Sequence, residues 1–288
     1  MKISISRQVK RVDRFVLDRW LPPRLKTAHK GDFGRILLLC GAVGYTGAPV
    51  LAAQAAVRTG AGLVFLGVPA SVYPIVAGKL LEPMAFPLAD RDGMLSEAAV
   101  PAILERLKTC DACLIGCGLG KSAGTLAAVK AVLENAHCPV VVDADGINVL
   151  EGHIDVLRGA ACPVIVTPHD GEFRRLGGEL SGSRRSAAWR LHRETGATVL
   201  LKGHRTVICG DEGCYVNLCG NPGMATGGSG DVLAGVIVSL LGQGLSPTKA
   251  AAAGAWLHGT AGDLCARRIG EYGMLPSDIL DVLPRLLR

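Results

Sequence analysis

Residues 113–145 read CLIGCGLGKSAGTLAAVKAVLENAHCPVVVDAD. A short apolar run opens this stretch, a segment with helical spacing follows at 124–135, and a second apolar run closes it. A strand, a helix and a strand in succession form a βαβ unit, whose two strands lie parallel in one sheet. The stretch therefore predicts an α/β fold with a mostly parallel sheet covered by helices on both faces.

The same pattern recurs along the chain. The expected buried strands are RILLLC (35–40), LVFLGV (63–68), CLIGC (113–117), PVVVDAD (139–145), PVIVTPH (163–169) and TVLLKG (198–203), with a further helix at 48–60. After Lys202 two short alternating runs flank an Asp-Glu-Gly turn within 206–218, which predicts an antiparallel hairpin at the sheet edge. The last third is helical, from Asp231 onward and again after Ser246-Pro247, where Ser can cap and Pro can take the first helical position.

Composition fits one folded domain over residues 1–288, with no linker, repeat or low-complexity tract. Apolar residues make up 49% of the chain and charged residues 19%, which is enough apolar side chain for a substantial core. The net charge is +6, but the basic residues are mixed with acids outside short clusters at 7–14 and 184–193. A solvated face explains such clusters better than a nucleic-acid groove, because interleaved aromatic residues are missing. A mildly basic surface suits anionic small molecules such as nucleotides.

The cysteines and the hydropathy pattern favour a cytoplasmic protein. Ten cysteines occur in a long chain that opens with the charged stretch MKISISRQVKRVDR, so a reducing compartment is expected. Cys110, Cys113 and Cys117 have a spacing that resembles a metal cluster, but no fourth ligand lies nearby in sequence. No apolar run approaches the roughly 20 residues of a membrane span.

Polar residues follow the apolar strands one after another. The runs lie at 41–47, 116–120, 143–146, 167–170 and 202–204, and they hold Asp143, Asp145, His169 and Lys202. Each alone could be a turn or a helix cap. The carboxyl ends of parallel strands share one rim, however, and ligands of open α/β proteins bind there. The sequence therefore predicts a polar binding site on this rim.

The most informative segment is NPGMATGGSGD (221–231), which leads directly into the apolar helix VLAGVIVSLLG. Leu233, Val236, Ile237, Leu240 and Leu241 form one apolar stripe, and Gly242 and Gly244 can end the helix. Glycines at a helix start expose amide donors, and the helix end adds about half a positive charge. Gly227, Gly228, Ser229 and Gly230 therefore predict an anion hole.

Asp231 stands at the start of this helix. It can be a first-turn acid, or a base that takes a proton from a substrate hydroxyl while the amides stabilise a phosphoryl group. The loop is not a Walker A motif, because no Lys-Ser or Lys-Thr follows the glycines.

His258 and Trp256 fall in the Ala-rich final helix, where core packing is the expected role.

Six motifs in the same order resemble the ADP-dependent NAD(P)H-hydrate dehydratases of the ribokinase-like superfamily. They are HKGDFGR (29–35), the loop 41–47, VVDADGIN (141–148), TPHDGEF (167–173), LKGHRT (201–206) and GNPGMATGGSGDVLAG (220–235). The resemblance spans nearly the whole chain. It implies a three-layer α/β/α sandwich and a hydro-lyase that repairs hydrated nicotinamide dinucleotides.

The resemblance also implies a reaction and its residues. ADP would phosphorylate the ring hydroxyl of (6S)-NADHX or (6S)-NADPHX, after which phosphate leaves to give NADH or NADPH, with AMP as the other product. The residues implied for the hydrated dinucleotide are Ala48, Gly118, His169 and Asp231. The residues implied for ADP are Lys202, Gly203, His204, Arg205, Thr206 and Gly230.

Cofactors and partners follow from the same resemblance. Magnesium is expected because phosphoryl transfer usually needs a cation that bridges phosphates, and its ligands are not identified. Glu172 is a weak candidate, with a surface salt bridge as the competing interpretation. The resemblance implies a homotetramer and an NAD(P)HX epimerase on a separate chain, with no nucleic-acid or membrane partner.

The sequence departs from the family pattern at two positions. Cys117 stands where the family usually has Pro in a GPGLG loop, and Ser229 replaces Thr in GTGD. Both departures keep the glycines, so we expect little effect on the site.

Two rival functions stay open on sequence alone. A ribokinase-like kinase of vitamin precursors would use the same glycine-Asp motif but leave the phosphate on its product. A non-catalytic nucleotide sensor would use the same rim only to bind, and the intact Asp231 argues against it.

Overall fold

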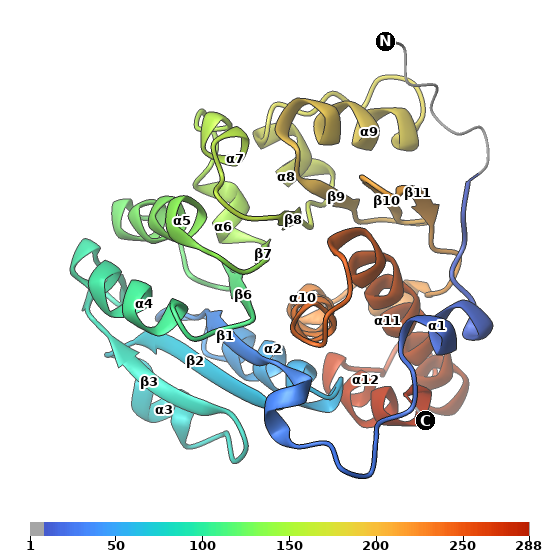
Figure 1. Cartoon of the computed structure of the whole chain (residues 1–288), viewed down its shortest axis with the longest axis horizontal. Helices are drawn as coiled ribbons and strands as arrows, with labels where there is room; N and C mark the ends of the chain where they lie inside the picture. The colour runs from blue at the N-terminus through green and yellow to red at the C-terminus, as the bar shows by residue number, and fades with distance from the viewer. Residues whose placement is uncertain (1–8, 288) are drawn as a thin grey trace.

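A computed structural model describes residues 9–287 of the chain, so residues 1–8 and 288 of the expected domain lie outside the described part (Figure 1). Its centre is a nine-stranded sheet in the order β11-β10-β9-β8-β7-β6-β1-β2-β3. The strands are β1 (Arg35–Leu39), β2 (Leu63–Pro69), β3 (Met84–Leu88), β6 (Ala112–Ile115), β7 (Val140–Val142), β8 (Val164–Val166), β9 (Thr198–Leu201), β10 (Val207–Gly210) and β11 (Gly213–Val216). All neighbouring pairs from β9 to β3 are parallel, which confirms the predicted sheet.

Helices cover both faces of the sheet. They are α1 (Arg14–Trp20), α2 (Gly47–Arg58), α3 (Tyr73–Ala77), α4 (Val100–Leu107), α5 (Ala123–Asn135), α6 (Asp145–Asn148), α7 (Asp155–Arg158), α8 (Asp170–Arg175), α9 (Arg184–Thr195), α10 (Ser229–Gly242), α11 (Pro247–Ile269) and α12 (Pro276–Val282). One core cluster joins the sheet to α1–α3 and α10–α12, and a second joins it to α4–α9. The predicted three-layer α/β/α sandwich is therefore confirmed (Figure 1).

The alternation of side chains along a strand explains the two cores. On β1, Ile36 and Leu38 belong to the first cluster, whereas Leu37 and Leu39 belong to the second. Successive side chains of a strand point to opposite faces of the sheet. A strand with both faces covered by helices must then be apolar at every position, which is why these runs show no polar alternation.

Both edges of the sheet differ from its centre. β10 and β11 form the predicted antiparallel hairpin, with Cys209 opposite Cys214. A disulfide joins these two cysteines, although a reducing compartment was expected, and the other eight cysteines are free thiols. The opposite edge strand, β3, was not predicted. It contains Pro87 and is partly exposed, as edge strands allow.

A second small sheet was also missed. It pairs β4 (Asp90–Arg91) with β5 (Met94–Leu95) in antiparallel register. Two-residue strands carry too little periodicity to be recognised from sequence.

The central helix α10 is more deeply buried than its predicted stripe indicated. Every residue from Val232 to Leu241 is buried, because the helix lies between the sheet, α2 and α11. A helix that is apolar all round belongs to a core rather than a surface. The helix begins at Ser229, two residues before Asp231, and ends at Gly242 as expected.

The start of α11 also shows one difference. Pro247 is the first helical residue and Ser246 holds the N-cap position, but the Ser246 hydroxyl bonds to the Glu212 carboxylate instead of capping the helix. Within residues 9–287 no helix is both long and apolar enough to cross a bilayer.

Candidate active site

The rim at the carboxyl ends of the parallel strands brings the predicted loops together. The Gly41 amide, after β1, donates to the Cys117 carbonyl after β6 at 2.9 Å. The Lys202 amide, after β9, donates to the Pro168 carbonyl after β8 at 2.8 Å. Loops that are far apart in sequence thus share one edge of the sheet, as the strand order requires.

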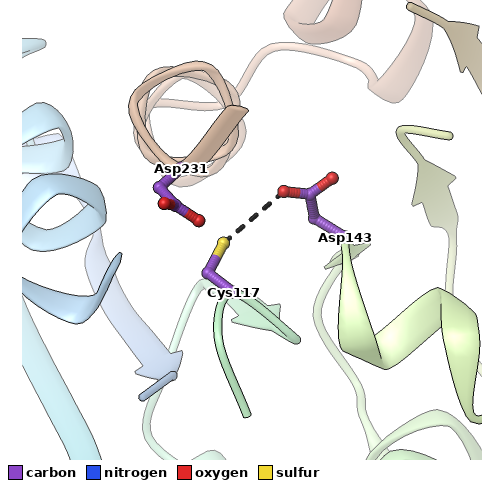
Figure 2. Close-up of side chains that lie close together, drawn as sticks. All are labelled: Cys117, Asp143 and Asp231. Atoms are coloured by element: carbon purple, nitrogen blue, oxygen red, sulfur yellow. Dashed lines mark hydrogen bonds between the residues drawn. The ribbon is translucent and has the colours of Figure 1, made fainter. Parts of the chain in front are cut away.

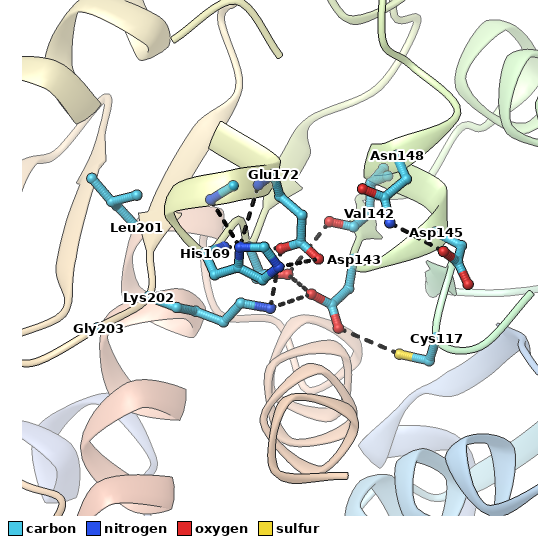
Figure 3. Close-up of polar contacts among 12 residues, drawn as sticks. Cys117, Val142, Asp143, Asp145, Asn148, His169, Glu172, Leu201, Lys202 and Gly203 are labelled. Atoms are coloured by element: carbon cyan, nitrogen blue, oxygen red, sulfur yellow. Dashed lines mark hydrogen bonds and ion pairs between the residues drawn. The ribbon is translucent and has the colours of Figure 1, made fainter. Parts of the chain in front are cut away.

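An ion pair between Asp143 and Lys202 lies at the centre of this rim (Figure 3). Lys202 Nζ lies 2.9 Å from Asp143 Oδ1, and the Thr167 hydroxyl donates to the same oxygen at 2.6 Å. The Asp143 side chain is 2% exposed and that of Lys202 is 21% exposed. Burial lowers the pKa of Lys202, but the Asp143 and Glu172 carboxylates more than offset this effect, so the pKa is raised and the amine stays charged.

Asp143 had no assigned role in the sequence analysis. The sequence feature that points to it is the position of this carboxylate directly after the fully buried strand β7. A buried charge needs a partner, and Lys202, directly after β9, supplies it.

Glu172 corrects an expectation. It is buried rather than part of a surface salt bridge, with only 4% of its surface exposed. Its carboxylate accepts from the His169 amide at 2.9 Å, and Oε2 lies 3.6 Å from Lys202 Nζ. Glu172 therefore closes a capping box at the start of α8 while it faces the lysine.

His169 holds the N-cap of α8 at the same rim (Figure 3). Its ring Nδ1 accepts hydrogen bonds from the Gly171 and Glu172 amides at 2.9 and 3.3 Å. The side chain is 55% exposed, and its Nε2 lies 3.3 Å from Glu172 Oε1.

The glycine-rich loop delivers amide donors to this rim. Gly228 adopts φ +97°, a conformation that favours glycine, and it is the N-cap of α10. Among residues 9–287, the amides of Gly227, Gly228, Gly230 and Asp231 have no hydrogen-bond acceptor within the chain. Free amides of this kind are normal for a first helical turn and suit an anion.

Ser229 is the exception among the four predicted anion-hole residues. Its amide donates to the Thr226 carbonyl at 3.3 Å, and its buried hydroxyl lies 3.3 Å from His258 Nε2. Burial lowers the pKa of His258 to about 4, so this histidine is a neutral partner in the core. In this structure Ser229 presents no free donor to the rim.

Gly230 faces the ion pair. A Cβ placed on Gly230 would lie 3.6 Å from Lys202 Nζ and 3.9 Å from Asp143 Oδ2. The helix start, the lysine and the carboxylate therefore border the same small space.

Asp231 lies across from Asp143, with Cys117 between them (Figure 2). One carboxylate oxygen of each acid and the Cys117 sulfur all lie within 4.8 Å of one another. Burial, followed by the charge of Asp143, raises the pKa of Asp231 to about 6, against the opposing effects of Cys117 and Lys202. A carboxylate with a pKa near neutrality suits general-base chemistry.

Cys117, one of the two departures from the family pattern, contacts a rim acid. Its thiol lies 3.6 Å from Asp143 Oδ2. Cys110 and Cys113 take no part in any metal-ligand group among the described residues.

Ala48 and Gly118, the other residues implied for the dinucleotide, lie side by side. Gly118 adopts φ +63°, and a Cβ there would stand 2.9 Å from those of Ala48 and Tyr45. Only glycine allows the loop after β6 to approach the start of α2 so closely.

The segment 202–206 forms the tight turn between β9 and β10. The Thr206 hydroxyl donates to the Gly203 carbonyl at 2.9 Å, and Arg184 donates to the Lys202 carbonyl at 2.5 Å. His204 and Arg205 are exposed beyond the turn. Five of the six predicted nucleotide residues therefore lie in this one turn, and the sixth, Gly230, lies at the start of α10.

The site thus combines a carboxylate of raised pKa, free helix-start amides and one partly buried lysine. Amides and lysine can stabilise a negatively charged group in transfer, while the carboxylate accepts a proton from the attacking hydroxyl. This combination supports phosphoryl transfer to an alcohol.

Comparison with known proteins agrees with this chemistry. A family model described as NAD(P)H-hydrate dehydratase matches residues 36–285. The bifunctional NAD(P)H-hydrate repair enzyme Nnr of Moorella thermoacetica is 47% identical over 93% of this chain and 52% of its own length. The ADP-dependent (S)-NAD(P)H-hydrate dehydratase of Neisseria meningitidis is 39% identical over 89% of this chain and 86% of its own. The chain spans about half the length of the bifunctional relatives it matches.

Solved structures show the same fold. A ribokinase-like superfamily protein from Enterococcus faecalis superposes with a TM-score of 0.85 at 29% identity, covering 97% of this chain and 95% of that chain. The ADP/ATP-dependent NAD(P)H-hydrate dehydratase of Bacillus subtilis, co-crystallized with ATP/Mg²⁺, gives a TM-score of 0.83 at 31% identity and 98% coverage of both chains. Fold, rim and relatives agree, and the chain belongs to the ribokinase-like NAD(P)H-hydrate dehydratase family.

Proposed function

We propose that this chain is an ADP-dependent (S)-NAD(P)H-hydrate dehydratase that returns (6S)-NADHX and (6S)-NADPHX to NADH and NADPH. The observation that carries the proposal is Asp231, a carboxylate with a pKa of about 6 beside the free amides of a helix start. The names of the Neisseria and Bacillus relatives supply the substrate class and the nucleotide.

In the first step Asp231 takes the proton of the substrate ring hydroxyl. The resulting oxygen attacks the β-phosphorus of ADP, an O–P bond forms, and the bond from that phosphorus to AMP breaks. In the second step the ring C–O bond breaks and inorganic phosphate leaves. A proton is lost from the neighbouring ring carbon, and the double bond of the reduced nicotinamide is restored.

The amides of Gly227, Gly228 and Gly230 are proposed to receive the phosphate oxygens. They are fixed donors at the positive end of α10 and need no reorganisation as negative charge develops. Lys202 would add one charge from the adjacent strand end, held in place by Asp143 and Glu172.

The two ligands would occupy neighbouring parts of the rim. We assign ADP to the segment 202–206 and Gly230, and the hydrated dinucleotide to Ala48, Gly118, His169 and Asp231. This division places the attacking hydroxyl at Asp231 and the transferred phosphoryl group between Asp231 and Lys202.

Magnesium is proposed to accompany the nucleotide, as in the Bacillus relative co-crystallized with ATP/Mg²⁺. The residues present do not form a magnesium cage, because Asp143 already accepts bonds from Lys202, Thr167 and Cys117, and a thiol is a poor ligand for this hard cation. When bound, magnesium would neutralise phosphate charge. We assign no residue to it.

A direct test is the recovery of NADH absorbance from hydrated NADH supplied with ADP or with ATP. The dehydratase restores the absorbance and releases inorganic phosphate in equal amount. A ribokinase-like kinase would instead accumulate a phosphorylated product, and a nucleotide sensor would bind ADP without turnover. Either result would refute the proposal.

Three further parts of the proposal are a cytoplasmic location, a homotetrameric assembly and an epimerase on a separate chain. Light scattering of the purified protein measures the assembly. Addition of an NAD(P)HX epimerase to an assay with mixed epimers should raise NADH recovery toward completion, because only one epimer is a substrate.

A further inference from the structure

Cys117 places a thiol between the two acids of the rim (Figure 2). Its Sγ lies 3.6 Å from Asp143 Oδ2, within 4.8 Å of an Asp231 carboxylate oxygen, and the residue is fully buried. The backbone fixes this position, because the Cys117 carbonyl accepts the Gly41 amide at 2.9 Å and the neighbouring Gly116 amide donates to the Leu39 carbonyl at 3.1 Å.

We infer that Cys117 is a positioning residue, whose single thiol proton bonds to Asp143 or Asp231 and keeps the Asp231 carboxylate oriented and ionised for proton abstraction. The inference rests on the proposed function in one respect, the role of Asp231 as base. The contact itself does not depend on which alcohol is the substrate.

The thiol must act as a donor rather than as a thiolate. A hydrogen bond with Cys40 and burial raise the pKa of Cys117 well above its ordinary value, and both acids raise it further. A neutral thiol beside two carboxylates has only a proton to offer. As a donor it stabilises the ionised form of the acid that it contacts, and its hydrogen bond lowers the pKa of Asp231.

Other groups around Asp231 act in both directions. Asp143 and Asp145 raise the pKa of Asp231, whereas Cys117 and Lys202 lower it. Lys202 directs its amine at Asp143 and Glu172, at 2.9 and 3.6 Å. Cys117 is thus the neutral donor that acts on Asp231 without a competing ion pair.

Proton transfer to Asp231 would change which acid needs the thiol. Before the step both carboxylates are ionised, and the thiol proton can serve either. After the step Asp231 is neutral and Asp143 still carries its charge, so the bond to Asp143 is favoured. No electron or heavy atom moves in this exchange, and the thiol keeps its proton throughout.

The test compares Cys117→Ala, Cys117→Ser and a matched control, Cys113→Ala. Cys113 is also a fully buried thiol, but it belongs to the opposite core and lies away from both acids. The readout is the pH dependence of kcat/KM for NADH recovery. A packing defect alone lowers activity at every pH, whereas loss of a donor to Asp231 moves the acidic limb.

We expect Cys117→Ala to shift the acidic limb upward by about 0.5 to 1 pH unit, the effect of one lost hydrogen bond to a carboxylate. Cys117→Ser should keep the limb within a few tenths of the wild-type position, because a hydroxyl replaces the donor. Cys113→Ala should leave the limb in place. An unshifted limb in Cys117→Ala, or an equal shift in the serine variant, overturns the inference.

A second measurement needs no turnover. NMR titration of carboxyl-labelled aspartates, with Asp231 assigned through Asp231→Asn, reports its protonation in the whole protein. The same upward shift in Cys117→Ala supports the inference even if hydrated NADH proves not to be the substrate. No shift in this titration refutes it, whatever the activity of the wild-type enzyme.

Discussion

Replacing Asp231 by Asn should slow turnover strongly while leaving the structure of the site unchanged. Asn has nearly the volume of Asp and keeps a polar group beside Cys117, but it cannot accept the hydroxyl proton. General-base catalysis contributes about 10² to 10⁴ in rate. We therefore expect kcat to fall at least about 100-fold, with the Kd for ADP changed less than about threefold.

The same substitution should make the folded protein more stable. Burial and Asp143 raise the pKa of Asp231 from 3.8 to about 6, which means that folding penalises its ionised form. The difference corresponds to an order of 2 to 3 kcal/mol at pH 8, where the carboxylate is ionised in both states. The penalty is nearly absent below about pH 4, grows as the pH rises from about 4 to about 6, and is constant above that range. Asn carries no such penalty.

Chemical denaturation of wild type and Asp231→Asn at pH 8 and pH 4 measures this effect. We expect the variant to be more stable at pH 8, with the advantage lost at pH 4. Equal stability at pH 8 would contradict the unfavourable burial of Asp231, and unchanged turnover would eliminate it as the base. A gain in stability together with a loss of activity is typical of a catalytic residue whose ionised form is destabilised by the fold.

Three other perturbations test neighbouring parts of the site. Lys202→Met leaves Asp143 and Glu172 facing each other without a cation, so we expect a loss of about 2 to 4 kcal/mol in denaturation and a higher KM for ADP. Gly230→Ala places a methyl in ordinary contact with Lys202 and Asp143, so the free energy of unfolding should change by less than about 0.5 kcal/mol. Calorimetry should show ADP binding weakened at least about tenfold, because the methyl blocks the phosphate. Wild-type kcat/KM should fall as the pH drops through about 6, because the base becomes protonated; a flat profile down to pH 5 would contradict the pKa of Asp231.

The parallel centre of the sheet could be predicted because each of its strands is buried on both faces. A run such as ILLL or VVV has no solvent-exposed side, so each of its positions is apolar. The strand can therefore be recognised from a single sequence. The edge strand β3 gave no such signal, since Met84 is 40% exposed and Pro87 lies within the strand. The full burial of α10 was not predicted, because the predicted stripe contained only the large aliphatic residues of the helix. The smaller residues on its other side are buried as well.

The rim could be located from sequence, but its contacts could not. Strand topology places Asp143, Glu172 and Lys202 near one edge, yet which acid pairs with which cation depends on side-chain distances of a few ångströms. The sequence left Glu172 as a weak candidate for a magnesium ligand, with a surface salt bridge as the competing interpretation, whereas the fold buries it beside the lysine. For Cys117 we expected little effect on the site, because the substitution keeps the flanking glycines. Its contacts with the acids that follow β7 and begin α10 are not visible in the sequence.

The charges of the rim explain why backbone amides must contribute most to nucleotide binding. Three carboxylates, Asp143, Glu172 and Asp231, face one amine, Lys202, so the side chains alone would repel ADP. Two of those carboxylates hold the lysine, and the third, Asp231, has a pKa of about 6. The attraction for phosphate then comes mainly from the free amides at the start of α10, although Asp231 lies in the first turn of the same helix. For this reason a methyl on Gly230, which alters no charge, should weaken ADP binding more than the removal of any exposed cation such as Arg205.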